Sequence, residues 1–257
     1  MKDKNLLNFK ELHNQNEILL VGNVWGLQSA IAFEKQGYKA ISTSSAAIAN
    51  SLELEDGEHM SFEQLNNTVK SITQKVSIPL TVDIEGGCSR NIDEIINNII
   101  TLHKNGVVGV NLEDSIVTSD REILNANEFS EIITTIKRSL NEKNIDIFLN
   151  IRTDGYIMGL ENPLESTLKR ITQYEKAGAD GIFVPCITDE SDIKQVVKSI
   201  SLPVNVMAIP NLPSFEILRS CGVKRISMGP FVYNYMNDTL NNILTKIKQD
   251  QTFNSLF

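Results

Sequence analysis

The chain has 257 residues, which suits one (β/α)8 barrel and does not require a second domain. Its 32 Asp and Glu residues outnumber 24 Lys and Arg residues, and the formal net charge of −8 argues against nucleic acid or an anionic membrane as a partner. Three widely spaced cysteines and the lack of a long apolar segment argue against a disulfide framework, a zinc site, a signal peptide and a membrane span, so we expect a cytoplasmic protein.

Short apolar segments alternate with helical segments along the whole chain. The first half is predicted to contain strands at 17–21, 40–43, 80–83, 107–112 and 147–152, and helices at 29–35, 61–75, 93–104 and 129–140. The second half is predicted to contain strands at 181–184, 203–208 and 225–228, and helices at 163–176, 191–200, 214–220 and 231–248. Eight strand–helix units with short loops favour an α/β fold in which residues 1–257 form one closed (β/α)8 TIM barrel, with an open doubly wound sheet as the alternative.

The last predicted helix, about residues 231–248, has apolar side chains at helical spacing. These are Val232, Met236, Leu240, Ile243 and Ile247. Two positions are open to this helix. It could pack on its own barrel as the eighth helix, or it could be exchanged with a neighbouring subunit.

An acidic pair follows the predicted strand at 80–83. Asp83 and Glu85 are two residues apart, so they point the same way on an extended chain. Two like charges on one side are unfavourable unless a cation or hydrogen-bond donors lie between them. Because Mg2+ prefers oxygen ligands, the pair predicts a metal site at the barrel mouth. The alternative is a salt-bridged turn, since Gly86 and Gly87 follow directly.

A second acidic pair and an arginine follow neighbouring strands. Glu113 and Asp114 end the predicted strand at 107–112, and because they are adjacent only one can face the barrel centre while the other has a structural role. Arg152 ends the strand at 147–152. Its guanidinium could bind a substrate carboxylate in a bidentate manner, and it could pair with one of these acids, since the two roles do not exclude each other.

Two loops add hydroxyls and a further acid. Ser42, Ser44 and Ser45 lie where the second strand gives way to a short helix, and their hydroxyls with free backbone N–H groups could bind an anion. The alternative is a helix cap with no ligand. Asp56, followed by Gly57, could hold a metal-bound water, although alone the pair would only indicate a turn.

Several short sequence motifs, in the same order along the chain from Asn23 to the final helix, resemble those of the isocitrate lyase/phosphoenolpyruvate mutase superfamily. They lie at residues 37–45, 56–57, 83–87, 106–114, 150–154 and 177–183. The resemblance implies a (β/α)8 barrel whose last helix is swapped between subunits of a homodimer or homotetramer. It also implies a Mg2+ or Mn2+ ion bound mainly by Asp83, with Asp56, Glu85 and Glu113 holding metal waters.

The same resemblance implies a reaction. Superfamily members form or cleave a C–C or P–C bond next to a 2-oxo acid, and the metal stabilises the pyruvate enolate that develops. Ser44 and Ser45 would hold the substrate carboxylate and Arg152 the substrate or its departing group. The implied catalytic residues are Arg152, Glu113 and Ser44, and the implied substrate-binding residues are Ser42, Ser44, Ser45, Arg152 and Trp25.

The chain departs from well-known members in four features. The Lys-Lys-Cys-Gly-His loop of isocitrate-type lyases is missing, and Cys88 stands where an aromatic residue is common. The lid at 115–126 is shorter than in the mutases and contains only Arg121 as a cation, and Gly26 replaces an aspartate. We therefore expect a Mg2+-dependent lyase of a small 2-oxo or 2-hydroxy diacid. The alternatives are a phosphonopyruvate/phosphoenolpyruvate mutase or hydrolase, and a non-catalytic 2-oxo-acid-binding protein.

Overall fold

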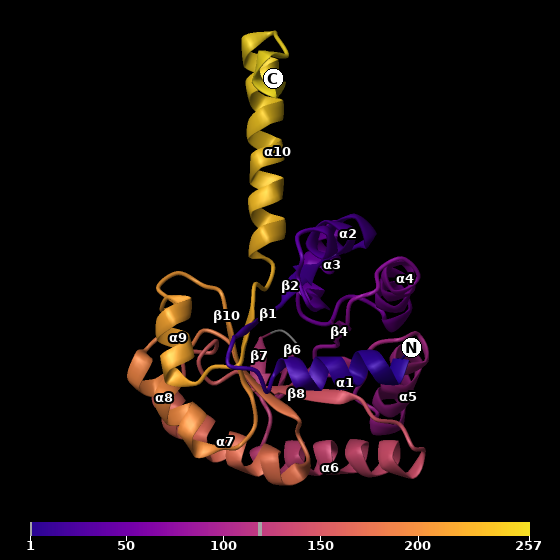
Figure 1. Ribbon diagram of the computed structural model, residues 1–257, viewed down its shortest axis with the longest axis vertical. Helices are drawn as coiled ribbons and strands as arrows, with labels where there is room; N and C mark the ends of the chain where they lie inside the picture. Colours follow the sequence, from indigo (N-terminus) through magenta and orange to yellow (C-terminus); the bar gives the residue numbers. More distant parts are fainter. Residues whose placement is uncertain (1, 118–119) are drawn as a thin grey trace.

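The parallel strands of this protein form a barrel, seen in a computed structural model that describes residues 2–117 and 120–257 (Figure 1). Seven of its strands follow one another in the row β3, β4, β5, β8, β9, β10 and β11. Their bounds are Ile41–Thr43, Leu80–Asp83, Gly109–Glu113, Phe148–Arg152, Gly181–Val184, Val204–Met207 and Arg225–Ser227.

A single segment closes this row into a barrel. Strand β1 (Leu19–Leu20) pairs with β11, and strand β2 (Gly22–Val24) pairs with β3, with only Val21 between them. The two short strands therefore connect both edges of the row. This arrangement confirms the predicted TIM barrel, while the predicted first strand at 17–21 begins later and extends further than the sequence indicated.

Helices follow the barrel strands as the sequence predicted, with end points that differ by a few residues. They are α2 (Leu27–Lys35), α4 (Phe62–Thr73), α5 (Ile92–Lys104), α6 (Ala126–Glu142), α7 (Pro163–Ala177), α8 (Glu190–Ser199) and α9 (Phe215–Cys221). Helix α4 begins with the predicted capping box: the Ser61 hydroxyl accepts from the Gln64 backbone N–H at 3.3 Å, and the Gln64 side chain accepts from the Ser61 N–H at 2.9 Å.

Helix α1 (Lys2–Leu12) was not predicted, and it covers the amino end of the barrel. Its Phe9 is buried against Phe148, the first residue of β8, with ring centroids 5.3 Å apart. Leu19 and Val108, which lie at the starts of other strands, join the same cluster. The amino end is therefore sealed by apolar side chains, and a ligand site has to lie at the other end.

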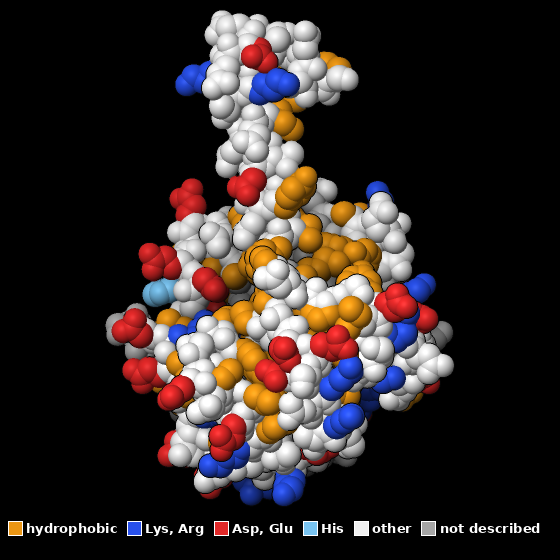
Figure 2. Space-filling model, turned by 90° about the vertical axis from the view of Figure 1, so that its left-hand side faces the viewer, with side chains coloured by type: hydrophobic (Ala, Val, Ile, Leu, Met, Phe, Trp, Pro, Cys, Tyr) orange, Lys and Arg blue, Asp and Glu red, His pale blue; other side chains and the backbone are white. Residues whose placement is uncertain are grey.

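Helix α10 (Phe231–Asp250) projects away from the barrel, and no residue of it is buried (Figure 1). Figure 2 shows hydrophobic side chains gathered at its base. Apolar residues along the helix are exposed: Phe231, Val232, Tyr235, Met236, Leu240 and Leu244. One of the two predicted positions had this helix packed on its own barrel, and the structure does not show that position. No described helix is both long and apolar enough to span a membrane.

Two further elements lie at the carboxyl end of the strands. Helix α3 (Ser45–Ser51) follows β3 directly. The segment predicted to be a lid, 115–126, contains an antiparallel hairpin of β6 (Ser115–Val117) and β7 (Arg121–Ile123). Residues 118–119 of this segment lie outside the described residues.

Candidate active site

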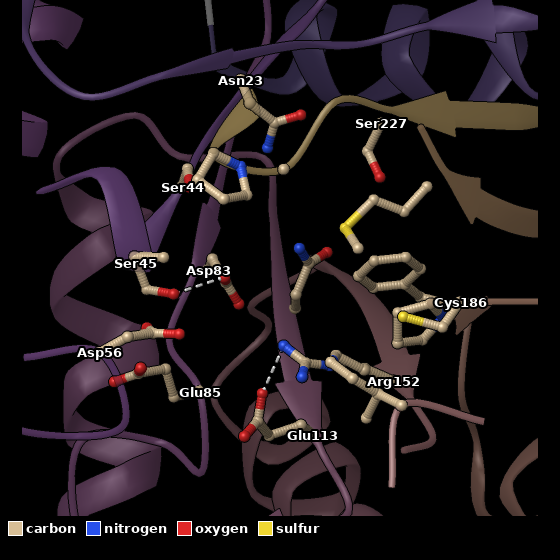
Figure 3. A pocket seen from close by; sticks show the side chains of 18 of the residues that line it. Asn23, Ser44, Ser45, Asp56, Asp83, Glu85, Glu113, Arg152, Cys186 and Ser227 are labelled. Atoms are coloured by element: carbon tan, nitrogen blue, oxygen red, sulfur yellow. Dashed lines mark hydrogen bonds and ion pairs between the residues drawn. The ribbon is translucent and has the colours of Figure 1, made fainter. Parts of the chain in front are cut away.

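A cavity of about 270 Å³ opens where the barrel strands end (Figure 3). It brings together most of the residues that the sequence singled out. The predicted residues that line it are Ser44, Ser45, Asp56, Asp83, Glu85, Glu113 and Arg152. The strand ends therefore converge as the sequence predicted.

Asp83 lies at the centre of the carboxylate side of this cavity (Figure 3). As the last residue of β4, its backbone N–H donates to the Thr43 hydroxyl at 2.9 Å, which fixes the strand end against β3. Its carboxylate accepts a hydrogen bond from the Ser45 hydroxyl at 2.8 Å. Burial raises the pKa of Asp83 because the charged form loses its hydration. This carboxylate is held in one orientation, and its nearby hydrogen-bond donor and cation do not fully offset the loss of hydration of its negative charge.

Glu85 connects the loop that follows β4 to the loop that contains Asp56 and Glu58. Its backbone is left-handed, with φ of 51°, and its carboxylate accepts from the Glu58 N–H at 3.1 Å. In return the Glu58 carboxylate accepts from the Gly86 N–H at 3.1 Å and pairs with Arg90. This exchange fixes the loop that contains Asp56, an exposed residue of the cavity lining, beside the end of β4.

The acidic side chains repel one another. Burial, followed by the charges of Asp83 and Glu113, raises the pKa of Glu85 to about 8. Such a set gains from a cation or from proton uptake. It has the chemistry of a hard-cation site, because all of its donors are oxygen atoms.

Glu113 and Arg152 form part of a four-membered ion-pair network. Arg152 contacts Glu113 at 2.7 Å and Asp154 at 2.6 Å. Arg121, from the hairpin, contacts the same two acids at 2.5 and 2.9 Å. Burial raises the pKa of Glu113, and Arg152 opposes that shift. The ion-pair alternative for Arg152 is therefore confirmed, and the hairpin is tied to the site through Arg121.

Asp114 points away from this network and has a structural role. It is fully buried and accepts hydrogen bonds from the Thr153 hydroxyl at 2.8 Å and the Asp154 backbone at 2.9 Å. Arg170 and the Tyr174 hydroxyl donate to it at 3.1 and 2.7 Å. The prediction that only one member of the pair at 113–114 faces the barrel centre is confirmed.

The predicted substrate-binding residues separate into two groups. Ser44 and Ser45 line the cavity, with the Ser44 hydroxyl capping α3 by accepting from the Ala47 N–H at 3.3 Å. Ser42 is buried within β3 and donates to the Thr43 carbonyl at 3.2 Å. Trp25 lies in a separate groove against α2 and the base of α10. The structure does not bring Ser42 or Trp25 to the cavity.

Sequence reasoning missed a set of asparagines inside the barrel. Asn150 donates to the Asn111 side chain at 2.9 Å, and Asn205 donates to the Ser227 hydroxyl at 3.1 Å. Asn23, Asn111 and Ser227 line the cavity. A signal was present, since each asparagine lies in the middle of a short apolar strand, where an unpaired amide would be costly. Arg121 and Cys186 also line the cavity and were not among the predicted site residues.

The carboxylates fit a divalent cation that keeps much of its water. Within residues 2–117 and 120–257, no three Asp, Glu, His or Cys side chains converge closely enough to hold an ion directly. Mg2+ is commonly held by one or two carboxylates and several waters. The donor set of carboxylate oxygens is therefore compatible with an ion of this kind.

Comparisons with known proteins give one consistent family. A family model described as phosphoenolpyruvate phosphomutase matches residues 9–248. An uncharacterized protein of Mycobacterium tuberculosis is 30% identical over 228 residues, covering 89% of this chain and 84% of that protein. The 2-methylisocitrate lyase of Escherichia coli K12 is 23% identical over 257 residues, covering 95% and 84%. The solved structure of phosphoenolpyruvate phosphomutase from Streptomyces platensis superposes with a TM-score of 0.87 at 18% identity. The match covers 98% of this chain and 90% of that one, and it supports the fold alone.

Proposed function

The chain belongs to the phosphoenolpyruvate phosphomutase family, and from that premise we propose that it is a carbon–carbon lyase of a small 2-oxo or 2-hydroxy diacid, acting through a pyruvate enolate. The observation that carries the proposal is the position of Asp83. Its carboxylate ends a barrel strand, is fixed by Ser45 and faces a cavity rich in acids. The lyase among the relatives supports the same reaction class.

The proposed cofactor is Mg2+ or Mn2+. Four carboxylates and only two guanidiniums are among the described residues that line the cavity, so a divalent ion would balance their charge. Asp83 would hold the ion directly, with water between it and Glu85, Asp56 and Glu113. When bound, the ion supplies positive charge that stabilises the developing enolate oxygen.

The side chains of the protein supply orientation. The Ser44 hydroxyl would hold the carboxylate next to the carbonyl, the Ser45 hydroxyl would keep Asp83 in place at 2.8 Å, and Arg152 would orient the departing portion. For a 2-oxo diacid, the bond from C3 to the distal carboxylate breaks and that group leaves as CO2. The electron pair of the bond becomes the C2–C3 double bond, and the carbonyl pair moves onto the enolate oxygen. A proton from water then adds at C3, which gives the 2-oxo acid product. Glu113 contributes by holding Arg152 in place at 2.7 Å.

A second candidate reaction acts on a P–C bond. The family model that matches 9–248 is described as a phosphomutase, and Arg121 places a second guanidinium beside Arg152. The substrate would then be phosphonopyruvate or phosphoenolpyruvate. A third candidate is a protein that binds 2-oxo acids without converting them.

One set of assays separates these candidates. Asp83→Asn should abolish Mn2+ binding measured by electron paramagnetic resonance and also pyruvate release from a panel of 2-oxo and 2-hydroxy acids. The matched control Asp93→Asn changes an exposed residue in the first turn of α5 and should preserve both. Unchanged turnover in the Asp83 variant would reject the assignment. Turnover of phosphonopyruvate alone supports the second candidate, and oxalate binding without any turnover supports the third.

We also propose a homodimer or homotetramer in the cytoplasm, with no membrane or nucleic-acid partner. Helix α10 exposes Leu240 and Leu244 along its length, and a groove lined by Trp25 and Phe33 lies at its base. Exchange of α10 between subunits would cover both surfaces. Leu240→Glu with Leu244→Glu should shift the mass measured by light scattering towards a monomer. The exposed Lys246→Glu is the control, and a monomeric wild-type protein would refute the assembly.

A further inference from the structure

The cavity has two chemically different halves. The half formed by the ends of β3, β4 and β5 carries hydroxyls and carboxylates, including Ser45 and Asp83. The opposite half, here called the apolar wall, comes from β9, β10 and the segment after β11. Its side chains are Phe183, Pro185, Cys186, Met207, Ile209 and Phe231. Figure 3 shows Asp83 and Cys186 on opposite sides of the cavity.

The backbone holds the apolar wall in place. Gly229 has a left-handed φ of 55°, and a Cβ atom there would lie 2.9 Å from the Met207 sulfur, so glycine allows Met207 to pack closely. Cys186 also has a left-handed backbone, with φ of 64°, which is uncommon for a residue other than glycine. Pro185 precedes it and fixes the strand end further. The wall is therefore a formed surface rather than a loose collection of side chains.

No described cation faces the apolar wall without an acid already paired to it. Arg121 and Arg152 are the basic residues among the described lining of the cavity, and both bind Glu113 and Asp154 at 2.5–2.9 Å. A carboxylate placed against the wall away from Arg152 would lose its hydration without gaining a positively charged partner. A hydrocarbon group placed there would gain from burial.

We infer that the substrate is a diacid with an alkyl group at C3 and that this group lies against the apolar wall, with the oxygen-rich end towards Ser44, Ser45 and Asp83. The enolate formed from it would be the corresponding homologue of the pyruvate enolate. This inference rests on the proposed function, which places the 2-oxo or 2-hydroxy carboxylate end at those residues. A cavity of about 270 Å³ limits the substituent to a small one. Met207, which packs closely at Gly229, is the residue of the wall whose replacement tests this preference.

Binding of a homologous series tests the inference without requiring turnover. Pyruvate, 2-oxobutanoate and 2-oxopentanoate would displace oxalate from the Mn2+-loaded protein in calorimetry. Each methylene should tighten binding about fourfold, as expected for buried hydrocarbon. Met207→Gln should reduce each step to less than about twofold while keeping the oxalate affinity. The control Met158→Gln changes a half-buried methionine outside the cavity lining and should retain the full series.

The outcomes separate the inference from the proposed function. A flat series in the wild-type protein, or a full series in Met207→Gln, overturns the apolar-wall inference even though oxalate binds and the proposed function stands. Failure of oxalate and of every 2-oxo acid to bind with Mn2+ overturns the proposed function and the inference with it. In the catalytic assay, read as release of the corresponding 2-oxo acid, 3-methyloxaloacetate should exceed oxaloacetate in kcat/KM by about fourfold, and the reverse order contradicts the inference.

Discussion

Asp114 supports the candidate site without lining the cavity, and replacing it by asparagine tests this structural role. The Asp114 Oδ2 atom accepts from Thr153, Arg170 and Tyr174, and Oδ1 accepts from the Asp154 backbone N–H. An asparagine oxygen can replace only one of these atoms, so its NH2 group faces a donor. Arg170, nearly buried, also loses its counter-charge. Breaking a buried pair in this way costs about 3–5 kcal/mol, of which an unsatisfied backbone N–H accounts for about 1–3 kcal/mol.

The measurement is urea unfolding at pH 7, with a matched control at the surface. Asp146→Asn removes a bond to Lys10 of 2.6 Å, shorter than the 3.1 Å between Arg170 and Asp114. Because Asp146 is 62% exposed, its loss should cost less than about 1 kcal/mol. Burial rather than distance decides the order. A loss below 1 kcal/mol for Asp114→Asn at an unchanged m-value, or equal losses for the two variants, would refute the reasoning.

The remaining predictions concern the acids of the cavity. In the metal-free protein, burial and the charges of Asp83 and Glu113 raise the pKa of Glu85 from its ordinary 4.5 to about 8. The folded state therefore holds a proton that the unfolded chain releases, so this contribution to stability is full below about pH 4.5 and is lost as the pH rises to about 8. The melting temperature measured in EDTA should fall as the pH rises from about 4.5 to about 8. The Glu85→Gln variant should lose this pH dependence. A melting temperature of the wild-type protein that does not change with pH over this range contradicts the prediction. Glu58→Gln should weaken Mn2+ binding about tenfold with an unchanged circular dichroism spectrum, because its loop is released. The exposed Glu63→Gln is its control, and equal Mn2+ affinity in both would exclude that role.

The barrel could be predicted because its strands repeat a local pattern. Apolar segments such as 80–83 and 147–152 are too short for helices and are separated by amphipathic helices, so eight units could be recognised without long-range information. Helix α1 carries Leu6, Phe9 and Leu12 among many polar residues, and its burial depends on contact with distant strand starts. Nothing local reports that contact. The hairpin at 115–123 is likewise too short for a periodic signal.

The site divides in the same way between local and long-range information. Asp83, Glu85 and Glu113 could be predicted because strand ends meet at one rim. Ser42 could not be separated from Ser44 by residue type, although two residues along a strand move a side chain about 6.6 Å deeper into the barrel. Cys186 enters the cavity through its left-handed backbone, a conformation that the sequence gives no reason to expect for cysteine.

The charge distribution inside the barrel supports the proposal of a cation at its mouth. Arg225 is fully buried below the cavity, and its Nη2 donates to the Thr81 hydroxyl at 3.3 Å. Its Nε and Nη1 atoms have no hydrogen-bond partner among the described residues. Thr81 lies two residues before Asp83 on the same strand and side, so a positive charge lies one layer beneath the Asp83 carboxylate. The divalent ion of the proposed function would be repelled from the barrel interior and attracted to the rim. The acids and the arginine together would then set the depth at which that ion, and the enolate oxygen of the proposed reaction, are held.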